Sequence, residues 1–213
     1  MNLVLFGPPG AGKGTQAAVL CTELGVPQVA TGDIFRRHLK EGTALGEKAR
    51  GFMNNGQLVP DEVVWDLVAA RLTEDDCEGG VLLDGFPRSL RQAELLVDWM
   101  KDNGRRLECV VALVVPDEVL VMRLARRRTC LSCGGTYHLD HAPTVVEGIC
   151  DTCGGEVVQR ADDNEETVRA RLETYHNTTS PVLTYFEGLG LARSVDGVGD
   201  ILSVSQRISL AIG

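Results

Sequence analysis

The stretch Gly7-Pro8-Pro9-Gly10-Ala11-Gly12-Lys13-Gly14-Thr15 follows the apolar run 2–6 and leads into a segment, 13–24, of helical character. It matches the spacing G-x-x-x-x-G-K of a phosphate-binding loop. Backbone N–H groups of such a loop turn towards phosphate oxygens, and the following helix adds the positive end of its dipole. Because strand, loop and helix occur in the order that the motif requires, the stretch predicts a nucleotide-phosphate site in an α/β protein.

One position of this loop departs from its common form. Gly14 follows Lys13, where most such loops have a Ser or Thr that binds Mg²⁺, and Thr15 comes one residue late. We therefore expect Mg²⁺ to be held mainly by the nucleotide and water, with a carboxylate elsewhere orienting that water. Asp84, which follows the apolar run 81–83, is the candidate; the alternative is that it caps a helix.

Further apolar runs predict the rest of a sheet. They cover residues 81–83, 109–115 and, more weakly, 191–195, and a short run at 28–30 predicts a fifth strand. These runs are continuously apolar rather than alternating, which indicates a parallel sheet that is covered on both faces. The sequence therefore predicts a five-stranded parallel sheet flanked by helices.

Helical patterns lie between these runs. Residues 62–72 and 90–100 each place their apolar side chains on one face. Pro116, followed by two acidic residues, predicts the start of another helix, because an acidic first turn suits the helix dipole.

A further helix is expected after residue 162. Asp163, with Glu166 three residues later, resembles a capping box. The helix that it opens should run through Tyr175 until Pro181 kinks or ends it.

The composition is that of one ordinary globular domain with small insertions. The chain has 213 residues with a formal charge of −9, which argues against non-specific binding to nucleic acid or to an anionic membrane. No apolar run reaches the length of about 18 residues that a membrane span needs, and the N-terminus does not resemble a signal peptide. An odd number of cysteines, some of them in C-x-x-C pairs, fits a reducing compartment, so we expect a cytoplasmic protein.

Four of the seven cysteines form the pattern Cys130-x2-Cys133-x16-Cys150-x2-Cys153, which is typical of a four-cysteine zinc site. Free thiols, or another metal such as iron or cobalt, are the alternatives. Four thiolates leave no open coordination position, so the metal is expected to be structural. The pattern lies in the segment 129–158, which is rich in Gly, Thr and Cys and predicts an inserted mini-domain.

Motifs spread along the chain resemble those of the adenylate kinases, in that family's order. They are GPPGAGKGTQ at 7–16, ATGD at 30–33, LVP at 58–60, LLDGFPRS at 82–89 with Gln92, and DDNEETVRARL at 162–172. The resemblance implies the reaction ATP + AMP ⇌ 2 ADP, with Mg²⁺ as the partner of ATP, in a monomer whose zinc-binding lid is of the long bacterial type.

The same resemblance implies the phosphate-loop nucleoside-monophosphate-kinase fold. Its core would comprise 1–29, 60–125 and 164–213, with an NMP-binding flap at 30–59 and a zinc-bearing lid at 126–163. Hinges are then expected near residues 30, 59, 126 and 163.

Phosphoryl transfer depends on positioning and charge stabilisation, which requires fixed cations around two phosphate groups. By resemblance, the ATP side comprises Gly10, Ala11, Gly12, Lys13, Gly14, Thr15, Arg123, Arg127, Thr136, Tyr137 and Gly199. The AMP side comprises Thr31, Arg36, Gln57, Leu58, Val59, Gly85, Phe86, Pro87, Arg88, Gln92, Arg160 and Arg171. Those expected to be catalytic are Lys13, Asp84, Arg88, Arg123, Arg127, Arg160 and Arg171. No general base is expected, because the attacking phosphate oxygen is already an anion.

Selectivity for adenine is expected to come from Thr31, the backbone at 57–59 and the Gln92 amide, although Gln92 could also be a plain helix-surface residue. One detail of the lid departs from the family. The sequence His141-Ala142-Pro143-Thr144 stands where Asn-Pro-Pro-Lys is common, so the resemblance does not predict the conformation of the hairpin there.

Two other functions remain open from the sequence. One is a nucleoside monophosphate kinase with another preference, for UMP and CMP or for GTP as donor. The other is a phosphate-loop switch that hydrolyses nucleotide, against which the chain has no guanine-reading Asn-Lys-x-Asp motif.

Overall fold

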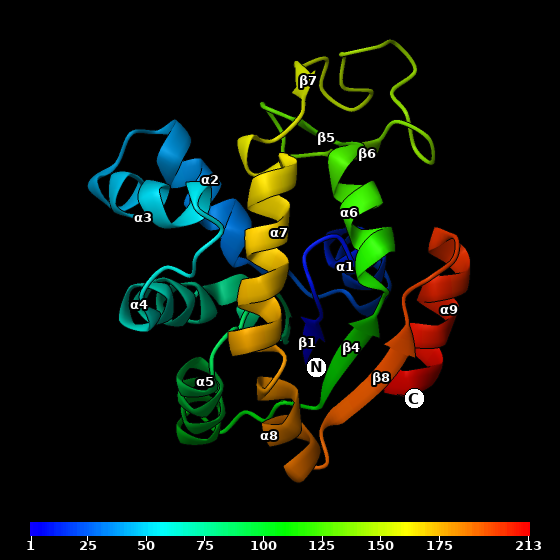
Figure 1. Cartoon of the computed structure of the whole chain (residues 1–213). Coiled ribbons are helices and arrows are strands. Elements are labelled where there is room, and N and C mark those ends of the chain that lie inside the picture. Colours follow the sequence, from blue (N-terminus) through cyan, green and yellow to red (C-terminus); the bar gives the residue numbers. More distant parts are fainter.

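A five-stranded parallel sheet forms the centre of the computed structural model, which describes all 213 residues (Figure 1). The strand order is β2-β3-β1-β4-β8, and every neighbouring pair is parallel. The strands are β1 (Asn2–Phe6), β2 (Gln28–Ala30), β3 (Val81–Asp84), β4 (Cys109–Val114) and β8 (Ala192–Asp196). The predicted five-stranded parallel sheet is confirmed, with strand ends that shift by a residue at most.

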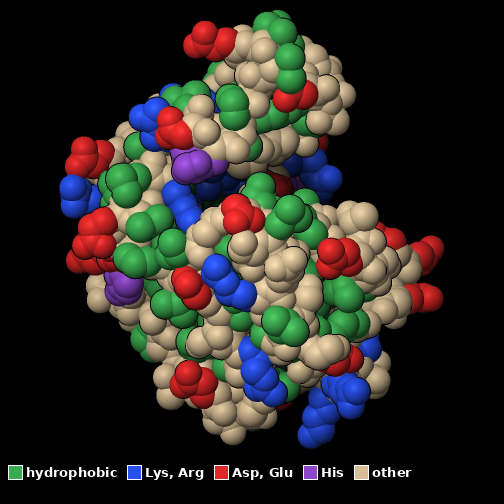
Figure 2. All heavy atoms as spheres, turned by 90° about the vertical axis from the view of Figure 1, so that its right-hand side faces the viewer, with side chains coloured by type: hydrophobic (Ala, Val, Ile, Leu, Met, Phe, Trp, Pro, Cys, Tyr) green, Lys and Arg blue, Asp and Glu red, His purple; other side chains and the backbone are tan.

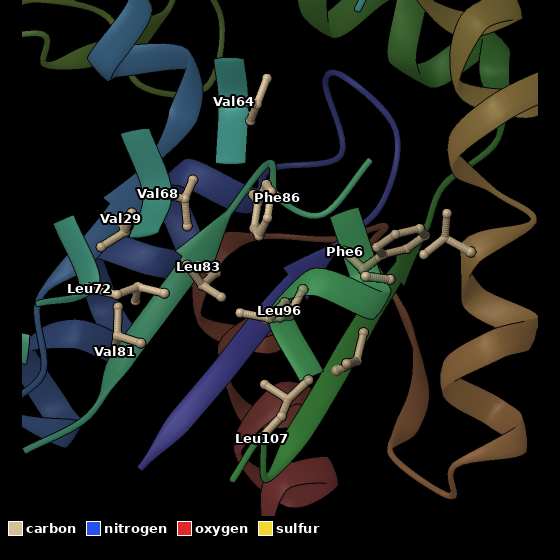
Figure 3. Close-up of a cluster of buried hydrophobic side chains, with 14 of the residues drawn as sticks. Phe6, Val29, Val64, Val68, Leu72, Val81, Leu83, Phe86, Leu96 and Leu107 are labelled. Atoms are coloured by element: carbon tan, nitrogen blue, oxygen red, sulfur yellow. The ribbon is translucent and has the colours of Figure 1, made fainter. Parts of the chain in front are cut away.

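Helices cover both faces of the sheet, because its strands are apolar on both sides. Val4 and Phe6 of β1 point into one core cluster, whereas Leu3 and Leu5 point into the other. Figure 3 shows part of the first cluster, where Phe6 and Leu83 face side chains from helices that include Val68 and Leu96. The first cluster includes side chains of α4 (Asp61–Leu72), α5 (Leu90–Asp102) and α8 (Val182–Gly188), together with Phe35 of α2 (Thr31–Lys40) and Ala49 of α3 (Ala44–Asn54). The second includes side chains of α1 (Lys13–Leu24), α6 (Asp117–Ala125), α7 (Glu165–Thr174) and α9 (Ile201–Ile212).

Two segments project from this core on the same side of the molecule (Figure 1). The first holds α2 (Thr31–Lys40) and α3 (Ala44–Asn54). The second is a small antiparallel sheet of order β6-β5-β7, made of β5 (Arg127–Cys130), β6 (Thr136–His138) and β7 (Val157–Val158). Lys40 Nζ donates to the carbonyl oxygen of Leu131 at 3.0 Å, so the two projections touch each other.

The predicted N-cap of α7 is wrong by one residue. Asn164, not Asp163, caps the helix, because its side chain accepts from the backbone N–H of Thr167 at 2.9 Å. Asp163 belongs to the short 3₁₀ turn Ala161–Asp163 and is buried.

The helical conformation continues through Tyr175 and is interrupted before Pro181, as predicted, although its last turn is not α-helical. The helix stops at Thr174, a π-helical turn covers Tyr175–Thr179, and Pro181 stands at the start of α8. A second 3₁₀ turn lies at Asp75–Cys77. None of the helices combines the length and the hydropathy that a membrane crossing requires.

Candidate active site

The phosphate-loop motif joins β1 to α1, and its lysine is held inside the loop. Lys13 Nζ donates to the carbonyl oxygens of Gly7 at 2.8 Å and Pro8 at 2.9 Å. Burial lowers the pKa of Lys13 to about 8; Asp84 opposes this shift, while Arg88 and other guanidinium groups add to it. An ammonium group has three N–H donors, so one remains for a ligand.

Asp84 lies beside the loop at the end of β3. A Cβ placed on Gly14 would be 3.5 Å from Asp84 Oδ2, so the carboxylate adjoins the position where Ser or Thr commonly stands. Gln28 Nε2 donates to the same oxygen at 3.1 Å. Burial raises the pKa of Asp84, and Lys13 and Arg88 oppose that shift. Asp84 caps no helix, since Ser89 caps α5, so the capping alternative is wrong.

Arginines from four separate elements form one group, and three of them act on the charge of Lys13. Arg88 precedes α5, Arg127 lies on β5, Arg160 follows β7, and Arg171 lies on α7. Burial, with a smaller contribution from neighbouring arginines, lowers the pKa of Arg88 to about 10 and that of Arg160 to about 9. Like charges repel at short range, so this arrangement is favourable only opposite anions.

Two adjacent carboxylates hold part of this group in place. Asp163, whose side chain is fully buried, accepts from Arg127 Nε at 2.8 Å and Nη2 at 2.5 Å, and from Arg171 Nη1 at 3.2 Å. Asp162 Oδ2 lies 2.9 Å from Arg171 Nη1. Burial would raise the pKa of Asp162, but Arg171 and the neighbouring arginines outweigh it and hold the pKa below its usual value.

The cations nevertheless outnumber the carboxylates. The side chains that influence one another here are Lys13, Arg36, Arg88, Arg127, Arg160 and Arg171 on the cationic side, and Asp33, Asp84, Asp162 and Asp163 on the anionic side. In a chain of formal charge −9 this local excess of positive charge is what a site for a phosphate-rich ligand requires. Figure 2 shows a groove below the upper lobe, with Lys and Arg side chains visible in its walls.

A pocket opens next to this group, between the end of β3 and the helices of the first projection. Many of the residues expected on the AMP side line it, namely Thr31, Arg36, Gln57, Leu58, Val59, Gly85, Arg88, Gln92 and Arg171. Gly32, Phe35, Met53, Gly56, Val64 and Asp162 complete the lining. Phe86, Pro87 and Arg160 do not line it; Phe86 belongs to the hydrophobic core, where it stacks on Trp65.

Gln92 is not a surface residue, which removes that alternative. It is 1% exposed, its Oε1 accepts from the backbone N–H of Arg88 at 2.8 Å, and its Nε2 donates to Asp61 Oδ1 at 2.7 Å. Thr31 is also buried, and its hydroxyl donates to the carbonyl oxygen of Gly85 at 2.9 Å. The pocket therefore has a fixed polar wall.

The remaining residues expected on the ATP side lie away from this pocket. Arg123, on α6, donates to the carbonyl oxygen of Gly197 at 3.2 Å, in the loop that also contains Gly199. Burial lowers the pKa of Arg123, and Asp196 opposes this. Thr136 and Tyr137 lie on β6, where the Tyr137 hydroxyl is 3.2 Å from Cys150 Sγ.

The four cysteines of the C-x-x-C pairs form one cluster at the tip of the second projection. Their Sγ atoms all lie within 4.8 Å of one another, with Cys130 and Cys153 3.5 Å apart and Cys133 and Cys150 3.6 Å apart. Four thiolates around a tetrahedral ion at about 2.3 Å are about 3.8 Å apart, which these distances approach. The cluster can therefore hold a metal ion.

Each pair of cysteines stands on a tight turn that a glycine completes. Gly134 and Gly154 adopt φ angles of 76° and 71°, the left-handed region that favours glycine. Their N–H groups donate back to the carbonyl oxygens of Cys130 and Cys150, at 3.1 and 2.9 Å. These turns direct the two sulfur atoms of each pair to the same side.

Sequence reasoning missed the residues that position the site. Asp61 and Asp163 are the clearest cases, because each bonds a predicted site residue that lies 31 or 36 positions away. The only local signal was acidity next to a motif: Asp61 follows LVP, and Asp163 lies in DDNEET.

Comparisons with known proteins agree with this geometry. The family model described as "Adenylate kinase" matches residues 5–191. Curated proteins named "Adenylate kinase" are similar over nearly the whole length. The one from Lachnoclostridium phytofermentans is 47% identical over 213 residues, covering 100% of this chain and 98% of that protein. One from Geobacter sp. strain M21 is 49% identical over 212 residues (100% and 99%), and one from Archaeoglobus fulgidus 49% over 208 residues (98% and 96%).

Proposed function

The chain belongs to the adenylate kinase family, and from that premise we propose that it transfers the γ-phosphoryl group of ATP to AMP, giving two ADP. One observation supports this most strongly. Arg88, which lines the neighbouring pocket, acts on the charge of Lys13 in the phosphate loop, and Asp84 acts on both, so donor and acceptor phosphates bound at the two places would share one group of cations.

We propose that the phosphate loop, Arg123, Arg127, Thr136, Tyr137 and Gly199 hold ATP. The backbone N–H groups of the loop and the start of α1 would bind phosphate oxygens, and Lys13 would neutralise charge on the transferring group. Arg123 donates to the loop 197–200, which contains Gly199, and neither residue lines the pocket, which suits contact with the nucleoside part of the donor.

We propose that the pocket lined by Thr31, Arg36, Gly85, Arg88 and Gln92 holds AMP. Its arginines would fix the acceptor phosphate, and Gln92 would bind the base. Arginine suits the phosphate because its planar guanidinium group can donate two parallel hydrogen bonds and keeps its charge.

Catalysis would then rest on position and charge. Arg160 and Arg171 would stabilise the negative charge of the transferring group between the two nucleotides. The acceptor oxygen is an anion already, so no side chain needs to remove a proton. Asp162 and Asp163 would keep the arginines in place before the nucleotides arrive.

The residues also fit Mg²⁺, which we propose as the partner of ATP. The ion supplies charge neutralisation for the phosphates when bound. Oxygen ligands suit it, and the Asp84 carboxylate beside Gly14 is placed to bind or orient one of its waters. Burial raises the pKa of Asp84, and nearby Lys13 and Arg88 oppose this by favouring the charged form that this role needs.

For the cysteine cluster we propose a structural Zn²⁺. The four Sγ atoms provide a closed set of soft ligands, and the segment around them has little core of its own: Val145, Val146 and Ile149 are exposed. The metal would replace the hydrophobic core that so small a unit cannot build.

We propose that 30–59 and 126–163 move as flap and lid on the core, about hinges near residues 30, 59, 126 and 163. Closure would exclude water, which could otherwise accept the phosphoryl group. Adenylate kinase lids are themselves an established example of such closure. We further propose a monomer in the cytoplasm, where a reducing environment would keep the cysteines available for metal.

A panel of nucleotides tests the function. ATP and GTP as donors, each with AMP, UMP, CMP and no acceptor, should give the highest kcat/KM for ATP with AMP. A preference for UMP or CMP would show a different monophosphate kinase. Nucleotide hydrolysis that does not depend on any acceptor would favour a phosphate-loop switch instead.

A further inference from the structure

Gln92 lines the pocket, yet the group that holds its amide nitrogen lies behind the pocket wall. Asp61, the first residue of α4, accepts from Gln92 Nε2 at 2.7 Å and is absent from the pocket lining. At the other end of the amide, the backbone N–H of Arg88 donates to Gln92 Oε1 at 2.8 Å. The side chain is therefore held at both ends.

These two partners are chemically unambiguous. A carboxylate only accepts hydrogen bonds, and a backbone N–H only donates them. If the amide were rotated by half a turn, its oxygen would face the Asp61 carboxylate and its NH₂ group would face the N–H of Arg88. Both bonds would be lost in a side chain that is 1% exposed, which is costly. The orientation of the amide is thus fixed.

The Asp61 carboxylate is itself held. Its second oxygen accepts from Ser89 Oγ at 2.8 Å, and Ser89 Oγ accepts from the backbone N–H of Gln92 at 3.1 Å. The chain of bonds runs from α4 through the cap of α5 and back to Gln92. It sets the amide in place before any ligand binds.

After these bonds, Gln92 retains one N–H donor and room for one more bond at Oε1. A base that offers an acceptor next to a donor can use both. In a 6-aminopurine, N1 accepts and the 6-amino group donates. In a 6-oxopurine, N1–H donates and the oxygen accepts, so the same edge carries the reverse pattern. With N1 beside Nε2 and the 6-amino group beside Oε1, the amide orientation that Asp61 selects matches the first pattern, and the rotated amide would match the second.

We infer that Asp61 is a positioning residue that sets the base selectivity of the acceptor pocket, by fixing the Gln92 amide in the orientation that matches a 6-aminopurine monophosphate. This inference rests on the proposed function, since it assigns the base of AMP to Gln92. Asp61 does not touch the nucleotide; it acts through the amide.

The test compares AMP with inosine 5′-monophosphate (IMP), which has the same size and phosphate but a 6-oxo group. The variant Asp61→Ala removes the acceptor that holds Nε2. The ratio of kcat/KM for AMP to kcat/KM for IMP, with ATP as donor, should fall by about tenfold, because discrimination by a bidentate hydrogen-bonding pair is of this order. It should not vanish, since the N–H of Arg88 still favours the original orientation.

Two controls separate this role from general effects. Glu62→Gln removes an exposed negative charge from the same first turn of α4 and should leave the ratio unchanged. Ser89→Ala removes the cap of α5 and the bond from Ser89 to Asp61 but keeps the direct bond between Asp61 and Gln92, so it should lower stability with a ratio within about twofold of wild type. A purely structural role for Asp61 would make Asp61→Ala behave like Ser89→Ala.

The isosteric variant Asp61→Asn covers the case in which Asp61→Ala does not fold. Its amide can face Gln92 with either end, so its ratio should lie between those of wild type and Asp61→Ala. Dissociation constants for AMP and IMP, measured by calorimetry, should follow the same order.

The outcomes are distinguishable. If wild type phosphorylates AMP and the ratio in the folded Asp61 variants stays within twofold of wild type, the inference is wrong and the function stands. If wild type neither binds nor phosphorylates AMP, the proposed function fails and the inference with it.

Discussion

Asp163 binds the guanidinium group of Arg127 with both carboxylate oxygens, at 2.8 and 2.5 Å from Nε and Nη2. The pair joins the small antiparallel sheet to the turn before α7, and the Asp163 side chain is completely buried while that of Arg127 is 17% exposed. Burial of an ion pair is tolerable only when the geometry is good and the remaining bonding capacity is used, and here Arg171 takes up part of it. The pair therefore orders the cationic site at the base of the lid.

We predict strong coupling between these two residues. Asp163→Ala should destabilise the protein by about 3 kcal/mol, because it leaves Arg127 and Arg171 without their buried partner. In a double-mutant cycle with Arg127→Ala, the two changes should be far from additive. Urea unfolding measures both. The exposed pair Arg169 and Glu165, at 2.8 Å, is the matched control and should show coupling of about 0.5 kcal/mol or less; equal coupling in the two pairs would contradict the account.

Lys13 should give the free protein a characteristic pH dependence. Its pKa in the fold, about 8, lies below the ordinary value of 10.5, so between these values the unfolded chain binds more protons than the folded one. Stability from this group therefore rises with pH between 8 and 10.5, while the cost of burying the charge is fully present below pH 8. Relative to Lys13→Met, wild type should gain stability as the pH is raised from about 7 to about 9.5 in urea titrations. If the free energies of unfolding of wild type and Lys13→Met differed by the same amount over this pH range, burial of the Lys13 ammonium group would carry no cost.

Asp84 should control the requirement for Mg²⁺. Asp84→Asn keeps the shape and the neighbouring Gln28 but removes the charge beside Gly14. We predict a fall in kcat of about a hundredfold and a higher Mg²⁺ concentration for half-maximal activity. Asp66→Asn, an exposed substitution on α4, is the control and should change neither. A normal Mg²⁺ titration curve for Asp84→Asn would remove Asp84 from this role.

Removal of the metal should cost stability more than activity. A chelator should lower the Tm of wild type by more than about 5 °C, because the metal replaces a core in the lid. Cys130→Ser should have a low Tm that the chelator no longer changes, whereas Cys21→Ser, outside the cluster, should respond like wild type. An identical wild-type Tm with and without chelator would mean that the cluster holds no structural metal. At moderate temperature, where the protein stays folded, the chelator should reduce kcat only slightly.

The sheet and the phosphate loop could be predicted because their signals are local. Residues 2–15 contain strand, loop and lysine in one stretch, and the cysteine spacing of the lid is equally self-contained. The C-terminal helix α9 was not predicted. Of its apolar residues, Val204 and Ile208 are buried, but Leu202 and Leu210 are exposed. The apolar residues therefore do not mark a single face of the helix in the sequence. Its signal was the cap Asp200, which accepts from Ser203 N at 2.9 Å.

For the site, the sequence predicts which residue types and motifs take part, but not which side chains bond to one another. Asp163 fits a capping pattern as well as Asn164 does, and nothing local shows that Arg127 takes its carboxylate. From the sequence alone, Gln92 could be a helix-surface residue. Only the structure shows that its amide is buried and bonds to Asp61 and to the backbone N–H of Arg88. Partners far apart along the chain decide both cases, and only the fold brings them together.

The most direct test of the central claim follows the phosphorus itself. ATP labelled in its γ-phosphate should be incubated with Mg²⁺, AMP and the enzyme, and the products separated. We predict that the label appears in ADP at the β position, with two ADP formed for each ATP consumed, and that Lys13→Ala and Arg88→Ala abolish most of this transfer while remaining folded. Label that appears in inorganic phosphate at a rate that does not depend on AMP would contradict it.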